Sequence, residues 1–242
     1  CVCVCVCVCM CVCVCVLCSC VLMFLCSCVL VFNIFVLHPN NRVSTVQRKL
    51  MTTGKDKNVF NIAVNGNFDD CQNLVKTMFA DKTFSNDIKM SGVNSINWAR
   101  IIAQSVYYFY SYFLMEDDKR PINFSVPTGN FGDVYAGYLA KKMGLPINKL
   151  IVATNQNDIL HRAISKGSYE VENVSETLSP SMDIQVASNF ERLLYDLNEG
   201  DDLQTIDAMK NIKEEEKHII NQEKLDKIKA DRIRNTACNA GS

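Results

Sequence analysis

The chain has 242 residues, with 25 basic and 26 acidic side chains and a formal net charge of −1. This balance excludes the concentrated basic surface that nucleic-acid binding needs, so we expect no nucleic-acid partner. Twelve of the fourteen cysteines lie within residues 1–28, which leaves only Cys71 and Cys238 in the rest of the chain. A cysteine-poor body is typical of a reducing compartment, and we predict a cytoplasmic location.

Residues 1–37 carry no charged side chain, and cysteine alternates with valine over the first half of this stretch. Alternating β-branched valine has the period of a strand and a poor helix propensity. The segment is nevertheless long enough to cross a bilayer, which would make it a membrane anchor and the membrane a partner. A third interpretation is a translated TG repeat, because the codons TGT and GTG alternate when such a repeat is read in frame. We predict that residues 1–31 do not belong to the fold, with the anchor as the alternative. Strict alternation lacks the usual metal-ligand spacings, so we predict no metal site.

From about Phe32 onward, short apolar runs alternate with longer helical segments. This pattern predicts an α/β fold with a mostly parallel sheet flanked by helices. Strands are expected at 33–37, 58–64, 122–126 and 149–154, and helices at 44–52, 69–79, 95–115, 130–144, 157–165 and 189–197. Mixed charge beyond Asn198 predicts solvated helices, and no element is expected over 235–242. We therefore divide the chain into 1–31, a central α/β part over 32–197, and a charged helical segment over 198–242.

The helix expected over 95–115 is apolar nearly all round, which predicts that it is the principal buried helix. Asn97, Arg100, Gln104 and Ser111 form one polar stripe along it. The stripe indicates either a surface that faces a ligand or the rim of the core.

The segment Ser125–Asp133 predicts a strand that passes through a tight turn into a helix. Gly129 and Gly132 would allow close backbone approach and unusual dihedral angles. Main-chain N–H groups at the start of the helix would then favour an anion. The glycine spacing alone is more typical of an ordinary strand-to-helix turn than of an anion site.

Several motifs in order resemble one family. They are Arg42-Val43-Ser44, Met51-Thr52-Thr53, Phe68-Asp69-Asp70-Cys71-Gln72, Asn94-Ser95-Ile96-Asn97-Trp98-Ala99-Arg100, Gly129-Asn130-Phe131-Gly132-Asp133, Ala153-Thr154-Asn155, Asn157-Asp158 and Leu178-Ser179-Pro180-Ser181-Met182-Asp183. Over residues 38–197 the chain is similar to threonine synthase, a pyridoxal-phosphate enzyme of fold type II. In that family the glycine turn holds the cofactor phosphate, so the resemblance implies that Gly129, Asn130, Phe131, Gly132 and Asp133 bind pyridoxal 5'-phosphate.

The resemblance implies a lyase of threonine biosynthesis that converts O-phosphohomoserine and water to threonine and phosphate. The family's Schiff-base lysine lies in an N-terminal block with no counterpart before His38, and its group for the pyridine nitrogen lies in a later block. We therefore expect a fold that is incomplete at both ends, no catalytic residue in this chain and an inactive fragment. The alternatives are a threonine-synthase-like phospho-lyase that releases a keto acid, and a non-catalytic, membrane-tethered fragment.

Four residues are candidates for contact with the substrate. They are Asn94, Ser95, Asn97 and Arg100. The planar guanidinium of Arg100 suits a phosphate or carboxylate, whereas the alternative for it is a structural ion pair. For His161 and Arg162 we predict a place on a helix surface.

Overall fold

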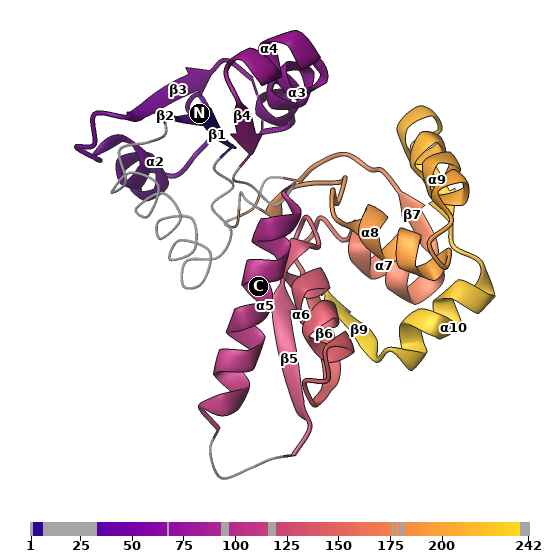
Figure 1. The fold of residues 1–242 in the computed structure, drawn as a ribbon. Helices are drawn as coiled ribbons and strands as arrows, with labels where there is room; N and C mark the ends of the chain where they lie inside the picture. Colours follow the sequence, from indigo (N-terminus) through magenta and orange to yellow (C-terminus); the bar gives the residue numbers. More distant parts are fainter. Residues whose placement is uncertain are drawn as a thin grey trace. The chain divides into compact units, whose positions relative to one another are not determined.

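The computed structural model describes residues 2–6, 33–66, 68–92, 97–115, 120–175, 177, 179 and 182–237. It divides into two compact units, residues 1–100 and residues 101–242, which are considered separately (Figure 1). Side chains on both sides of position 198 share one core in the second unit. The boundaries predicted at 31/32 and 197/198 stay predictions.

The first unit contains a four-stranded parallel sheet in the order β3-β2-β1-β4. Its strands are β1 (Val2–Val6), β2 (Asn33–Pro39), β3 (Val59–Val64) and β4 (Met90–Gly92), and its helices are α2 (Thr45–Thr52), α3 (Phe68–Ala80) and α4 (Lys82–Asp87). Leu37 of β2 packs with Cys71 and Val75 of α3 in a small apolar cluster. The predicted strands at 33–37 and 58–64 and the helices at 44–52 and 69–79 are present within two residues of their expected ends.

Strand β1 departs from the expectation that residues 1–31 lie outside the fold. Val4 pairs with Phe35 of β2 on one side and with Gly92 of β4 on the other. The physical reason is the alternation of valine itself, because β-branched side chains favour the extended backbone that a sheet requires. Residues 7–32 lie outside the described residues, so for them the expectation stays a prediction.

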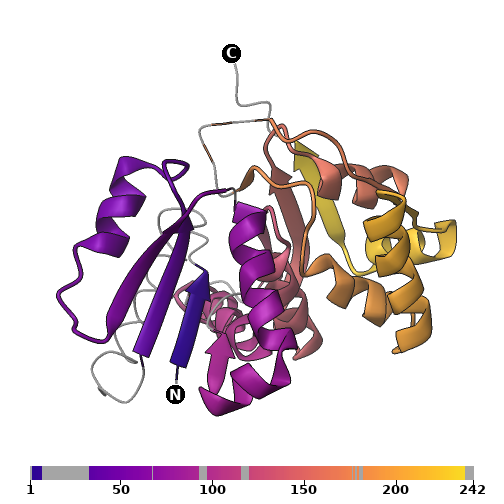
Figure 2. The ribbon, with the colours of Figure 1, turned by 90° about the horizontal axis from the view of Figure 1, so that it is seen from above.

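The second unit contains a three-stranded parallel sheet in the order β5-β6-β9 (Figure 2). It also contains an antiparallel pair, β7 with β8. The strands are β5 (Ile122–Pro127), β6 (Ile147–Thr154), β7 (Ser168–Glu170), β8 (Lys217–Ile219) and β9 (Ile233–Ala237), and the helices are α5 (Trp98–Phe113, whose first residues belong to the first unit), α6 (Gly132–Lys142), α7 (Ile159–Lys166), α8 (Phe190–Leu197), α9 (Asp202–Glu214) and α10 (Gln222–Ala230). Parallel sheets flanked by helices confirm the predicted α/β class.

Strand β9 corrects the expectation that residues 235–242 contain no element. Its residues 233–237 pair in parallel with residues 150–154 of β6, and Ile233 is fully buried. The run Ile-Arg-Asn-Thr-Ala has no apolar alternation, so its sequence gives no strand signal. The strand forms because β6 offers it an edge, which is a long-range interaction.

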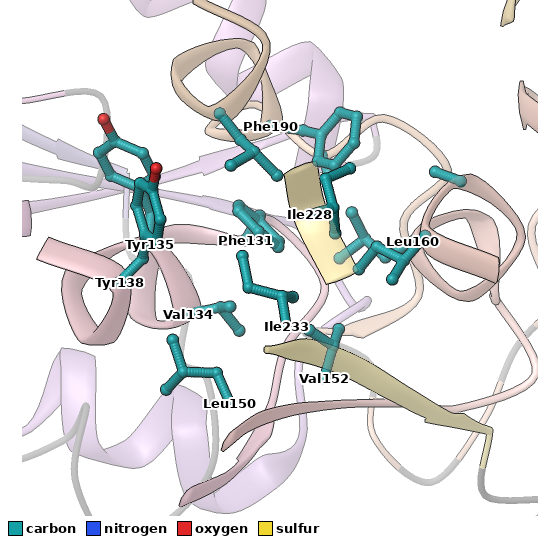
Figure 3. Packing of buried hydrophobic residues seen from close by; sticks show 14 of the residues in the cluster. Phe131, Val134, Tyr135, Tyr138, Leu150, Val152, Leu160, Phe190, Ile228 and Ile233 are labelled. Carbon is teal, nitrogen blue, oxygen red and sulfur yellow. The ribbon is translucent and has the colours of Figure 1, made fainter. Parts of the chain in front are cut away.

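The core of the second unit lies between the sheet and helices α6, α7 and α8 (Figure 3). Ala136 and Ala140 are fully buried on α6, where their small side chains let the helix pack closely. Leu150 and Val152 of β6 and Phe190 of α8 are buried in the same cluster. Helix α6 ends as its residues predict, because Gly144 takes a positive φ of 99° just beyond it.

Helix α5 differs from the expectation of burial nearly all round. Gln104 and Tyr108 are buried, whereas Val106, Tyr110 and Phe113 are more than half exposed. Of the predicted polar stripe, Arg100 and Gln104 are buried and Ser111 is exposed. An apolar composition therefore predicted the helix correctly but did not predict which face is covered.

The contact between α5 and α6 depends on the absence of a side chain at Gly137. A Cβ there would lie 2.6 Å from the Tyr108 ring and 2.9 Å from Leu150 Cδ2. We predict that Gly137→Ala lowers the free energy of unfolding by about 1–3 kcal/mol through overpacking. Urea denaturation measures this, and Gly54→Ala, which meets nothing within 4 Å, is the matched control. Equal stability of the two variants would contradict the prediction.

Candidate functional site

The turn predicted to bind an anion lies at the carboxyl end of strand β5 and leads directly into helix α6. Pro127 pairs with Ala153 of β6, and the Thr128 N–H donates to the Ala153 carbonyl at 3.0 Å. The turn therefore lies beside the ends of two parallel strands. Ligands of open α/β sheets bind at this edge.

The turn owes its shape to Phe131, which corrects our expectation for the glycines. Phe131 has φ 66° and ψ 3°, whereas neither Gly129 nor Gly132 has a positive φ. A left-handed conformation costs a residue with a side chain about 1–2 kcal/mol. Burial of the ring offsets this cost, because Phe131 is fully buried and packs edge-to-face on Phe190 with ring centroids 5.4 Å apart (Figure 3).

The two glycines provide space instead. A Cβ on Gly129 would lie 3.0 Å from Ile184 Cδ1 and 3.2 Å from Met182 Cα. A Cβ on Gly132 would lie 3.2 Å from Asn189 Nδ2 and 3.3 Å from Asn130 Oδ1. Larger residues at these two positions would therefore push on the neighbouring loop and narrow the turn.

Two main-chain donors of the turn are capped by its own side chains. The Phe131 N–H donates to Thr128 Oγ1 at 3.1 Å, and the Gly132 N–H donates to Asn130 Oδ1 at 3.0 Å. These oxygens occupy positions that anion oxygens would take at a helix start. Asp133 has only acceptor atoms in its carboxylate, and one of them lies 3.4 Å from the Tyr108 hydroxyl, so Asp133 can offer an anion only its main-chain N–H.

A polar network holds the loop that covers the turn. The Asp183 carboxylate accepts from Asn155 Nδ2 at 2.7 Å, Asn157 Nδ2 at 3.0 Å, Thr177 Oγ1 at 2.7 Å and the Thr177 N–H at 2.8 Å. Asn155 and Asn157 are buried directly beyond strand β6. The network therefore ties Asp183, which lies between Met182 and Ile184 in the loop, to the same edge of the sheet. Asn155, Asn157 and Asp183 belong to the motifs that resemble threonine synthase, but no site role was predicted for them. The signal that could have indicated one is the pair of asparagines directly after a strand.

Of the four predicted substrate residues, the structure describes Asn97 and Arg100. Asn94 and Ser95 lie outside the described residues. Asn97 Nδ2 donates to the Gly92 carbonyl at 2.6 Å, and Asn97 Oδ1 accepts from the Ala99 N–H at 2.9 Å, so this side chain supports the start of α5. Arg100 is buried in the first turn of α5. Their role in substrate binding stays a prediction.

Arg162 departs from the surface position expected for it. Its side chain is 12% exposed, and it donates to Asp158 Oδ1 at 2.8 Å and to the Glu170 carbonyl at 2.8 Å. Arg162 Nη1 also forms an ion pair with Glu172 Oε1 at 2.9 Å. Arg162 therefore connects α7 with strand β7 and is structural.

The described part of the chain contains neither a cluster of metal ligands nor a helix that could span a membrane. No group of three or more His, Cys, Asp or Glu side chains is placed to hold a metal ion there. No helix in that part is both long and apolar enough to cross a membrane.

Parallel strands, covering helices and a glycine turn at the carboxyl end of a strand define an α/β protein of the kind that binds phosphorylated small molecules. The chain matches no protein-family model. Threonine synthase of Pseudomonas aeruginosa is 58% identical over 166 residues, which cover 69% of this chain and 35% of that protein. Threonine synthase of Saccharomyces cerevisiae is 51% identical over 187 residues, which cover 74% and 36%.

Solved structures agree with the sequence matches. A pyridoxal-phosphate-bound threonine synthase from Brucella melitensis has a TM-score of 0.76 at 48% identity, over 86% of this chain and 45% of that one. Threonine synthase from yeast has a TM-score of 0.73 at 42% identity, over 86% and 43%. The resemblance to threonine synthase is therefore confirmed, and the fold is that of part of these enzymes. The chain spans about a third of the length of the curated relatives it matches.

We expect the hydrogen bonds to Asp183 to stabilise the folded chain. Asp183→Ala removes the acceptor of the Thr177 N–H and hydroxyl, and one of the acceptors of Asn155 and Asn157, which keep Thr177 Oγ1 and the Ser175 carbonyl. We expect it to lower the free energy of unfolding by about 3 kcal/mol. Urea denaturation measures the loss, and limited proteolysis should show faster cleavage within 175–188. Asp226→Asn, at a side chain that is 62% exposed, is the control and should change stability by less than about 0.5 kcal/mol. An Asp183→Ala protein as stable as this control would contradict the role of the network.

Proposed function

We propose that this chain is the cofactor-phosphate-binding part of a pyridoxal-phosphate-dependent lyase. The reaction of such an enzyme converts O-phosphohomoserine and water to threonine and phosphate. The observation that carries the proposal is the buried turn over 128–132 at the start of α6, in a chain similar to threonine synthases at 50–58% identity.

The turn fits a phosphate ester for three physical reasons. The positive end of the α6 dipole lies at Gly132, where it favours a dianion. The absence of side chains at Gly129 and Gly132 keeps the turn from being filled, since a Cβ at either position would meet neighbouring atoms at 3.0–3.3 Å. The Phe131 and Gly132 N–H groups donate to the side-chain oxygens Thr128 Oγ1 and Asn130 Oδ1, and they would bind a phosphate oxygen that replaces either of these. We assign the phosphate of pyridoxal 5'-phosphate to Gly129, Asn130, Phe131, Gly132 and Asp133.

The bound cofactor would supply an electron sink for the substrate carbon, and the chain would hold the cofactor phosphate in position. Burial of Phe131 keeps the turn in one conformation, so its amides need little reorganisation when the phosphate binds. The loop held by Asp183 packs Met182 and Ile184 against Gly129 and limits the access of water from that side. Asn94, Ser95, Asn97 and Arg100 remain our proposed contacts for the small-molecule substrate.

A glycine substitution tests the cofactor site. We expect Gly129→Val to reduce the affinity for pyridoxal 5'-phosphate at least tenfold, because the side chain displaces Ile184 and the backbone near Met182. Absorbance titration measures the binding. Gly54→Val is the matched control, since a Cβ at Gly54 meets nothing within 4 Å. Equal affinity of wild type, Gly129→Val and Gly54→Val would refute the proposed site.

Covalent attachment tests the absence of a catalytic lysine. We expect borohydride reduction of the chain with pyridoxal 5'-phosphate, followed by peptide mapping, to label no single lysine, because no lysine is assigned to the cofactor aldehyde. A control reduction with pyridoxal, which lacks the phosphate, shows the background labelling. Stoichiometric labelling of one lysine, with turnover of O-phosphohomoserine, would contradict this expectation. A keto-acid product would then favour the phospho-lyase alternative.

A further inference from the structure

Asn189 is a buried residue that lies against the turn although it comes from a distant part of the chain. It precedes α8, is 1% exposed, and donates its main-chain N–H to the Asn130 carbonyl at 3.0 Å. Its side chain makes no capping bond to α8. Instead, Asn189 Oδ1 accepts from Arg192 Nε at 3.1 Å. Because arginine only donates, this contact fixes which atom of the amide is oxygen and leaves Nδ2 on the other side.

Asn189 Nδ2 is a buried donor with no hydrogen-bond acceptor among the described residues. Such donors are rare in folded proteins and require an explanation. Nδ2 lies 3.2 Å from the position of a Cβ on Gly132, and Asn130 Oδ1 lies 3.3 Å from the same point. Because Cα–Cβ bonds of a helix tilt toward its N-terminus, this point lies at the end of α6 where the N–H groups have no acceptor within the helix.

We propose that Asn189 is a further ligand of the phosphate group, and that its Nδ2 donates to the anion at the start of α6. This inference rests on the proposed function. An anion oxygen that replaces Asn130 Oδ1 on the Gly132 N–H comes within reach of Asn189 Nδ2, which then gains the acceptor it lacks. The anion site is built from two segments, the turn over 128–132 and the residue before α8. The bond is charge-assisted, and therefore stronger than a bond between neutral groups.

Variants of the full chain test the inference by titration calorimetry with inorganic phosphate and with pyridoxal 5'-phosphate. We expect Asn189→Asp to weaken both affinities about tenfold to a hundredfold, because it removes the donor and adds a repelling charge. Asn189→Ala removes the donor without adding charge and should weaken them about tenfold. Asn198→Asp is the matched control, because Asn198 is buried at the other end of α8 and donates to Thr205. Its phosphate affinity should equal that of the wild type.

A double-mutant cycle separates direct contact from an effect through Asn130. With direct contact, Asn189→Ala weakens phosphate binding by the same factor in the wild type and in an Asn130→Ala background. Loss of the effect in that background would overturn the inference and make Asn189 a support for Asn130.

NMR of the unmodified chain gives a readout that does not depend on folding of a variant. The side-chain NH2 signal of Asn189 should move when phosphate is added, and a stationary signal while phosphate binds would overturn the inference.

The failure of this inference differs from the failure of the proposed function. If Gly129→Val abolishes phosphate binding while Asn189→Asp and Asn189→Ala bind as the wild type does, Asn189 is not a ligand and the turn still is. If the wild-type chain binds neither probe, both the proposed function and the inference are wrong.

Discussion

The site depends on one packing interaction, the burial of the Phe131 ring while its backbone is left-handed. The ring is fully buried and packs on Phe190, which in turn stacks on Tyr169 with ring centroids 5.2 Å apart. Free energy from burial of an aromatic side chain offsets the strain of the left-handed backbone. The main-chain N–H groups that follow Phe131 at the start of α6 are thereby held in place by the core of the second unit, and not by the turn alone.

The surrounding polar groups extend this arrangement over the carboxyl edge of the sheet. Asn155 and Asn157 follow strand β6, and both donate to Asp183. Asn189 then bonds to the carbonyl of Asn130, so the loop from 182 to 189 is tied to the sheet at one end and to the turn at the other. The strands beneath the turn and the loop that covers it would hold the main-chain N–H groups of the proposed anion site in place before an anion binds.

Local sequence patterns predicted most helices and strands correctly. They did not predict the elements that form through long-range pairing. The apolar run of β6 and the small-residue stripe of α6 have strong local signals, and both elements lie where they were expected. Strand β9 was missed because Ile233–Ala237 is extended only through its ladder with β6. The burial of α5 was predicted wrongly for the same reason, because composition does not reveal which apolar face of a helix packs against a neighbouring element.

The residue order alone established the strand, the glycine turn and the helix, together with the resemblance to threonine synthase, because these are local motifs of fixed spacing. It also indicated that the two glycines matter for close backbone approach, although the unusual dihedral angles expected of them are found at Phe131 instead. Tertiary structure alone decided that Phe131 carries the left-handed conformation, that Asp183 holds the covering loop, and that Asn189 presents a buried donor at the start of α6. Those contacts join residues far apart along the chain, and their energies come from burial and hydrogen bonding after the chain has folded, which local propensity does not encode.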